Sequence, residues 1–364
     1  MKLTKNELIW YGRNFTKDNV TYFDYSASGF EFCFTGTKAS ATILSDSPNW
    51  NAENVGVLAV YVSKINPNEY EGASLWQNFP EELTKKIFLT EQKNQIVLFE
   101  SEEIQTVLIR VLKISECAFG YAGFVDLEID GELVKPTGKQ ADAPKIEFIG
   151  DSITCGYGIE GVWNVDTFST KTERADKAYA FLTAKNLNAK FHLVSWSGIG
   201  IISNYVDESV NVPFIDWLMP SNWPYTDKSA QLRLGMEPEI WDETKFCPDI
   251  VVINLGTNDA SFVRDKEERR LSYVSSYKQL LEAVHRRSPN AKICCCLGLM
   301  GQLLNDSVKE AIERFNKEFP NVKTKMVDIP VQDEKDGIAA DWHPSAITHK
   351  KAAEQLSNAL KDFV

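Results

Sequence analysis

The pattern of apolar residues changes near residue 140, and this change constrains the fold more than any other feature of the chain. Before it, short segments rich in β-branched and aromatic residues are broken by Gly, Asn, Asp or Ser at intervals of about ten residues, a spacing typical of all-β domains. We expect an antiparallel β-sandwich or jelly roll in residues 1–138. The predicted strands are 20–27, 29–36, 39–46, 55–63, 94–101, 106–114 and 123–131.

Residues 134–145 are polar, contain two prolines and are interpreted as a linker. After them, strand and helix patterns alternate, which predicts a mostly parallel sheet with helices on both faces. The fold class is therefore α/β, with a three-layer α/β/α domain in residues 139–364. The predicted strands are 145–150, 190–198, 249–256, 291–299 and 324–330, and the predicted helices are 174–187, 267–288, 306–319 and 345–363.

Charge and cysteine content restrict the partners and the compartment. The formal net charge is −12 and no run of Lys or Arg forms a basic stripe, which argues against nucleic acid and anionic membrane surfaces as partners. The first residues lack the apolar region of a secretory signal, and no apolar run approaches the ~18 residues of a membrane span. The seven cysteines include no C-x-x-C pair. We therefore expect a cytoplasmic protein.

The stretch from Lys145 to Gly161, "KIEFIGDSITCGYGIEG", carries two competing signatures. Its glycines at 156, 158 and 161 fit the G-x-G-x-x-G pattern of dinucleotide sites, which begins directly at the end of a strand. Here the apolar strand ends at Ile149, well before Gly156. The pattern therefore favours turns over a nucleotide site, and we expect no cofactor.

The second signature places Ser152 directly after the predicted strand 145–150. A serine hydroxyl becomes an effective nucleophile when a base takes its proton, and the chain has four histidines that could serve as this base. His192 lies on a predicted strand, His285 at the end of a helix, and His349 inside the last helix. His343 lies in the loop before that helix and is the best placed catalytic base.

An attacked acyl group also needs hydrogen-bond donors for its oxyanion. "SWSGIG" offers the backbone N–H of Gly198 after one predicted strand, and "NLGTNDA" offers the side-chain amide of Asn258 after another. Asp151, beside Ser152, is interpreted as a local backbone-binding residue without a role in proton transfer. The carboxyl ends of successive strands thus carry a serine and two oxyanion donors.

These motifs, "GDSIT", "SG" at 197–198, "GTND" and "HPS", resemble in this order the four blocks of the SGNH (GDSL-type) hydrolases. The resemblance implies that Ser152 is the nucleophile and first oxyanion donor. It implies that Gly198 and Asn258 are the other donors and that His343 is the base. A sandwich followed by "GDSITCGYG" and "DWHPS" resembles carbohydrate esterase family two more specifically. That family removes O-acetyl groups from plant polysaccharides such as xylan and glucomannan, with its sandwich packed against the catalytic domain.

The chain departs from the SGNH pattern beside the histidine. The acid that usually stands three residues before the base is replaced by Ala340, and Asp341 stands two residues before it. Either Asp341 reaches Nδ1 of His343 through a different loop geometry, or a backbone carbonyl, for example that of Trp342, accepts that hydrogen bond. We count Asp341 as the third catalytic residue and keep the Ser–His dyad as the alternative.

Nine tryptophans suggest a sugar-binding surface, because aromatic faces stack on sugar rings. Trp342, Trp217 and Trp223 are the candidate substrate-binding residues. Metal-ligand spacing is absent from the sequence, so we expect a metal-independent reaction. The predicted function is a serine esterase that deacetylates hemicellulose oligosaccharides (mannan, glucomannan or xylan). The alternatives are an SGNH lipase or thioesterase and a non-catalytic carbohydrate-binding protein.

Overall fold

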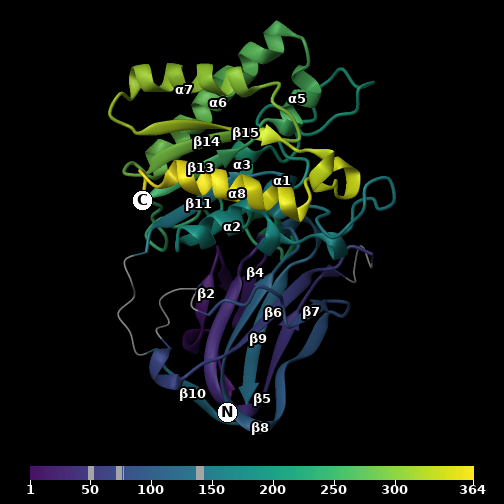
Figure 1. Ribbon diagram of the computed structural model, residues 1–364, viewed down its shortest axis with the longest axis vertical. Helices are drawn as coiled ribbons and strands as arrows, with labels where there is room; N and C mark the ends of the chain where they lie inside the picture. Colours follow the sequence, from purple (N-terminus) through teal and green to yellow (C-terminus); the bar gives the residue numbers. More distant parts are fainter. Residues whose placement is uncertain (48–52, 71–75, 77, 137–142) are drawn as a thin grey trace.

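The computed structural model describes residues 1–47, 53–70, 76, 78–136 and 143–364 (Figure 1). It consists of an N-terminal β unit, up to residue 136, and a C-terminal α/β unit that begins at residue 143. The predicted boundary between residues 138 and 139 lies in segment 137–142, outside the described residues.

The strands of the β unit form a single antiparallel sheet in the order β3-β4-β9-β5-β8-β6-β7. In addition, β1 pairs with β9, and both β2 and β10 pair with β5. The bounds are β1 (Lys2–Leu3), β2 (Ile9–Tyr11), β3 (Phe15–Lys17), β4 (Val20–Phe23), β5 (Gly29–Leu44), β6 (Val57–Lys64), β7 (Lys85–Phe88), β8 (Lys93–Lys113), β9 (Ala122–Ile129) and β10 (Glu132–Val134).

Two long strands fold this sheet over on itself. The predicted strands 29–36 and 39–46 are the two halves of β5, and 94–101 and 106–114 are the two halves of β8. The register shifts between Gly36 and Lys38, and β5 pairs with β10 before this point and with β9 after it. Strands that bend in this way pass from one layer to the other, so an aromatic core fills the space between the layers. The predicted antiparallel β fold is confirmed, although bent strands replace separate ones.

The α/β unit contains the parallel sheet that the sequence predicts, and its strand order is β12-β11-β13-β14-β15. Helices α2 (Tyr179–Asn186) and α8 (Ala346–Leu360) cover one face, and α6 (Glu267–Arg287) and α7 (Asn305–Glu318) cover the other (Figure 1). The strands are β11 (Lys145–Gly150), β12 (Lys190–Ser195), β13 (Ile250–Asn254), β14 (Lys292–Leu299) and β15 (Thr324–Val331). Short helices are α1 (Ser152–Cys155), α3 (Met219–Asn222), α4 (Lys228–Arg233) and α5 (Thr257–Val263).

One hydrophobic cluster joins the two units. Val57 and Leu112 of the β unit belong to the same buried cluster as Tyr179 and Ala180 of α2. Figure 1 shows the β unit lying against the side of the α/β unit where α2 and α8 are found. Burial of apolar surface from both units therefore fixes their relative position. Among the helices of the described residues, none is long and apolar enough to cross a membrane.

Candidate active site

The ends of three neighbouring strands bring the predicted site residues together. β11 lies between β12 and β13, with Gly150 in register with Ser195 on one side and Asn254 on the other. Ser152, Gly198 and Asn258 follow these three strands, so they meet at the carboxyl edge of the sheet.

A sharp strand-to-helix turn places Ser152, which is buried, at this edge. Asp151 has an extended backbone and caps α1, because its carboxylate accepts the Ile153 N–H at 3.0 Å. Only glycine fits before it, since a Cβ at Gly150 would lie 2.0 Å from Thr154 Oγ1. Burial raises the pKa of Asp151 to about 7. Ser152 is the first residue of α1, where backbone N–H groups have no partner within the helix.

The glycine-rich turn after α1 receives the loop that carries His343. Gly156 ends α1 in the left-handed conformation, with φ of 78°. A Cβ at Gly158 or Gly161 would lie 2.9 or 2.8 Å from the Cβ of Ala340. Gly158 and Gly161 are therefore required by the close packing of two loops. This packing explains why glycines stand in the G-x-G-x-x-G pattern.

His343 is hydrogen-bonded to the serine and oriented by the backbone. Its Nε2 lies 2.9 Å from Ser152 Oγ, and its Nδ1 lies 3.2 Å from the carbonyl oxygen of Asp341 and 3.3 Å from that of Ala340. Carbonyl oxygens only accept hydrogen bonds, so the proton of the neutral ring is on Nδ1. Nε2 is then free to accept the hydroxyl proton of Ser152.

Burial sets the protonation state of this base. His343 is buried, and the loss of solvation lowers its pKa to about 4, against smaller opposing effects of the two carbonyl contacts. The imidazole is therefore neutral at neutral pH, which is the form that can remove a proton.

The prediction that the Asp341 side chain orients His343 is wrong. Its carboxylate accepts a 2.5 Å hydrogen bond from the Tyr157 hydroxyl instead. The cause is local backbone geometry: Asp341 and Trp342 both adopt left-handed conformations, with φ of 49° and 63°. The carbonyl of Asp341, and not that of Trp342, faces Nδ1, because Trp342 O accepts from Gln332 Nε2 at 2.6 Å. The structure thus shows a Ser–His dyad supported by main-chain carbonyls.

Tyr157 belongs to the site although the sequence analysis assigned it no role. Its ring stacks on the His343 imidazole, with centroids 3.8 Å apart and planes 19° apart. In the sequence, the only indication was its position between Gly156 and Gly158. The folded structure is needed to show that the loop of His343 lies against its ring.

The backbone N–H groups of Ser152 and Gly198 are the two predicted main-chain oxyanion donors. Among the hydrogen bonds of the described residues, none uses the N–H of Ser152 or of Gly198. Gly198 has φ of 74° and an open space where a Cβ would lie. The Asn258 amide donates to the carbonyl of Ile199 at 2.9 Å and lies 3.4 Å from Asp151 Oδ2. The Asn258 amide nitrogen thus donates to two protein acceptors, and its role as an oxyanion donor stays a prediction.

Asp259 holds the loop after Gly198, a function that the sequence analysis did not assign. Its buried carboxylate accepts the N–H groups of Ile201, Ile202 and Ser203, at 2.7 to 3.2 Å for Oδ1. Burial raises its pKa to about 6. Asp259, the last residue of the "GTND" block, therefore accepts hydrogen bonds that hold this loop. Its place in that motif was the sequence signal that could have pointed to it.

The candidate substrate-binding tryptophans separate into two groups. Trp342 and Trp217 are 37% and 40% exposed, and each contacts a second tryptophan, Trp163 and Trp196, with ring centroids 4.6 and 5.6 Å apart. The prediction for Trp223 is wrong. Its side chain is 1% exposed and donates from Nε1 to Glu147 Oε1 at 2.9 Å, so it belongs to the core.

The loop that contains Gly198, residues 197–203, is called the oxyanion loop. A small cavity of about 190 Å³ lies beside it and is lined in part by Trp196, Gly198, Tyr205 and Trp217. Across the described part of the chain, no group of three His, Cys, Asp or Glu side chains is arranged to hold a metal ion.

Comparison with known proteins identifies the family of the chain. Residues 148–351 match the GDSL-like lipase/acylhydrolase family. A solved family two carbohydrate esterase from Clostridium thermocellum, in complex with cellohexaose, has a TM-score of 0.79 and 30% identity, covering 98% of both chains. The chain belongs to the GDSL-like lipase/acylhydrolase (SGNH) family and, within it, to the carbohydrate esterases of family two.

Two curated relatives carry names that describe an activity. The chain is 33% identical over 98% of its length to cellulase/esterase CelE of Acetivibrio thermocellus, and it spans 39% of that longer protein. It is 26% identical over 76% of its length to an acetylxylan esterase/glucomannan deacetylase of Cellvibrio japonicus, covering 73% of that protein.

Proposed function

We propose that this protein is a serine carbohydrate esterase that removes O-acetyl groups from hemicellulose oligosaccharides. The observation that carries the proposal is the 2.9 Å contact between Ser152 Oγ and a neutral, buried His343. The free N–H groups of Ser152 and Gly198 beside this pair supply the second requirement, donors for an oxyanion.

In the acylation step, His343 Nε2 takes the proton of Ser152 as Oγ attacks the acetyl carbonyl carbon. The carbonyl electron pair moves to oxygen, where the N–H groups of Ser152 and Gly198, with Asn258, stabilise the charge. When the tetrahedral intermediate collapses, the bond to the sugar oxygen breaks. The proton on Nε2 passes to that oxygen, which leaves a free sugar hydroxyl and acetyl-Ser152.

Deacylation repeats these proton transfers with water. His343 removes a proton from a water molecule that attacks the acetyl-serine carbonyl. Collapse breaks the bond to Oγ, returns the proton to Ser152 and releases acetate. The carbonyls of Ala340 and Asp341 hold the ring in the required tautomer throughout and stabilise the imidazolium.

The surface around Ser152 supports a carbohydrate substrate. Trp342 with Trp163, and Trp217 with Trp196, form two partly exposed aromatic pairs. The names of the relatives, acetylxylan esterase and glucomannan deacetylase, suggest xylan and glucomannan oligosaccharides as the substrate class. If the protein acts in the cytoplasm, these substrates are imported oligosaccharides, and finding the protein in the culture medium would contradict that part.

The test is acetate release from acetylated mannan and xylan oligosaccharides, without added metal or nucleotide. We expect release by the wild type and none by Ser152→Ala, while Ser209→Ala, at an exposed serine, keeps full activity. Preference for octanoyl over acetyl esters would instead indicate a lipase. Binding of the oligosaccharides without acetate release would indicate a carbohydrate-binding protein.

A further inference from the structure

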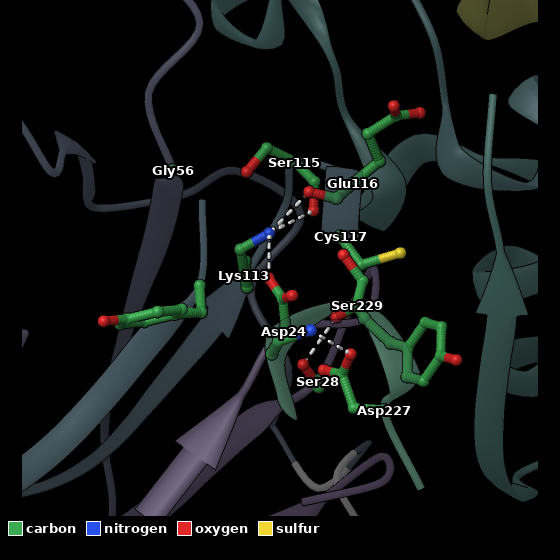
Figure 2. A network of polar contacts seen from close by, with 12 residues as sticks. Asp24, Ser28, Gly56, Lys113, Ser115, Glu116, Cys117, Asp227 and Ser229 are labelled. Atoms are coloured by element: carbon green, nitrogen blue, oxygen red, sulfur yellow. Dashed lines mark hydrogen bonds and ion pairs between the residues drawn. The ribbon is translucent and has the colours of Figure 1, made fainter. Parts of the chain in front are cut away.

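The end of strand β8 continues into a segment of the β unit that contacts the α/β unit at several points. This segment, residues 113–119, ends in a short 3-10 helix at Cys117–Phe119. The carbonyl of Ile114 accepts the Ala175 N–H at 3.1 Å, and the carbonyl of Cys117 accepts from Arg233 at 3.2 Å. Figure 2 shows this segment with its polar neighbours.

Within this segment, Glu116 reaches the oxyanion loop. Its side chain is fully buried, and its Oε2 accepts the backbone N–H of Ser197 at 3.0 Å. The Ser197 N–H belongs to the Trp196–Ser197 peptide, so this bond holds the peptide unit directly before the one that carries the Gly198 N–H. On the other side, the Gly198 carbonyl accepts the Tyr205 N–H at 2.9 Å. The direction of the Gly198 donor is therefore set in part by a residue of the β unit.

The surroundings of Glu116 keep it available as an acceptor. Lys113 donates to the Glu116 carbonyl at 2.6 Å and pairs with Asp24 at 3.2 Å, while the Glu116 carboxylate points away from the ammonium (Figure 2). The Glu116 N–H donates to Glu173 Oε2 at 2.9 Å. Burial raises the pKa of both carboxyl groups, and the charge of Glu116 raises that of Glu173 further. The geometry leaves Glu116 Oε2 as the acceptor of the Ser197 N–H.

We infer that Glu116 of the β unit is a positioning residue for the oxyanion hole: it holds the Ser197 N–H and thereby aims the Gly198 N–H at the reacting carbonyl. This inference rests on the proposed esterase function at Ser152. It assigns the β unit a direct contribution to the rate of the chemical step.

The test compares three variants that separate reach from charge. Glu116→Asp keeps the charge but is one methylene too short, whereas Glu116→Gln keeps the reach and the carbonyl acceptor. Ser115→Ala is a matched control, because the buried Ser115 Oγ accepts the Val57 N–H, also at 3.0 Å, but does so within the β unit. Each variant is first checked for folding by circular dichroism.

We expect Glu116→Asp to lower kcat for acetyl esters between about tenfold and 10²-fold with KM unchanged, because a small misplacement of a donor is costly. Inactivation by diethyl 4-nitrophenyl phosphate, whose phosphoryl oxygen occupies the oxyanion position as 4-nitrophenol leaves, should slow by the same factor. Glu116→Gln should be faster than Glu116→Asp in both assays, and Ser115→Ala should match the wild type.

Wild-type kcat in Glu116→Asp, or an equal loss in Ser115→Ala, would overturn the inference. Greater activity in Asp than in Gln would also overturn it, since charge and not reach would then matter. These results differ from failure of the proposed function, in which the wild type itself would release no acetate or Ser152→Ala would stay active.

Discussion

Tyr157 donates a hydrogen bond of 2.5 Å to the carboxylate of Asp341 and stacks its ring on His343 at 3.8 Å. One side chain therefore both contacts the catalytic base and engages the carboxylate that would otherwise be its partner. The Asp341 carbonyl is left to face Nδ1 of His343 at 3.2 Å.

This arrangement predicts a small effect of Asp341→Asn. The substitution leaves the main-chain carbonyl in place, so kcat should fall less than about tenfold, whereas loss of the carboxylate in a Ser-His-Asp triad costs about 10⁴-fold. Steady-state kinetics on an acetyl ester would measure this. A loss of several thousandfold would show that the carboxylate itself supports the base.

Tyr157→Phe should act through the same contact. It retains the stacked ring and removes only the hydroxyl, so its effect and that of Asp341→Asn should not add in the double variant. The measurement is a double-mutant cycle on kcat/KM. Fully additive effects would mean that the two residues influence His343 independently.

The low pKa of His343 predicts the acid limb of the activity profile. The base acts when neutral, and burial lowers its pKa to about 4, so activity should persist to about pH 5 and decline below that. The profile of kcat/KM against pH, with folding followed by circular dichroism at each pH, measures this. A limb near pH 6.5, the value of a solvated histidine, would contradict the burial argument.

Trp342 and Trp223 should respond oppositely to substitution. Trp342→Ala removes a partly exposed ring beside the base and should raise KM for acetylated oligosaccharides while leaving the protein stable. Trp223→Phe removes the donor to buried Glu147 and should lower the free energy of unfolding by about 1–2 kcal/mol with KM unchanged. Urea unfolding and oligosaccharide kinetics on both variants measure these effects. A loss of stability in Trp342→Ala with unchanged KM, or a raised KM in Trp223→Phe with unchanged stability, would contradict the prediction.

The buried carboxylate of Asp259 should contribute strongly to the stability of the fold. Asp259→Ala leaves the buried N–H groups of Ile201, Ile202 and Ser203 without their acceptor, at a cost of about 3 kcal/mol or more in unfolding free energy. Asp259→Asn keeps an oxygen at the position of Oδ1 and should cost far less. Equal melting temperatures for the two variants would exclude this account.

The fold class and the order of the site motifs could be predicted from local sequence patterns alone. Period-two and helical hydrophobic patterns depend on local chain geometry, so strands such as 145–150 and helices such as 267–287 were predicted within a few residues. Ser152, Gly198 and Asn258 could be placed at a common edge because parallel strands present their carboxyl ends there, and His343 could be chosen as the base because it lies in the loop before the last helix.

Features that depend on contacts between distant residues could be recognised only in the folded protein. Whether Asp341 offers its carboxylate or its carbonyl depends on left-handed backbone geometry and on Tyr157, which lies far away in the chain. The burial of Trp223 depends on Glu147, and the contact of Glu116 with Ser197 depends on packing of the two units. No local pattern encodes these pairings, because each is selected by the packing of the complete fold.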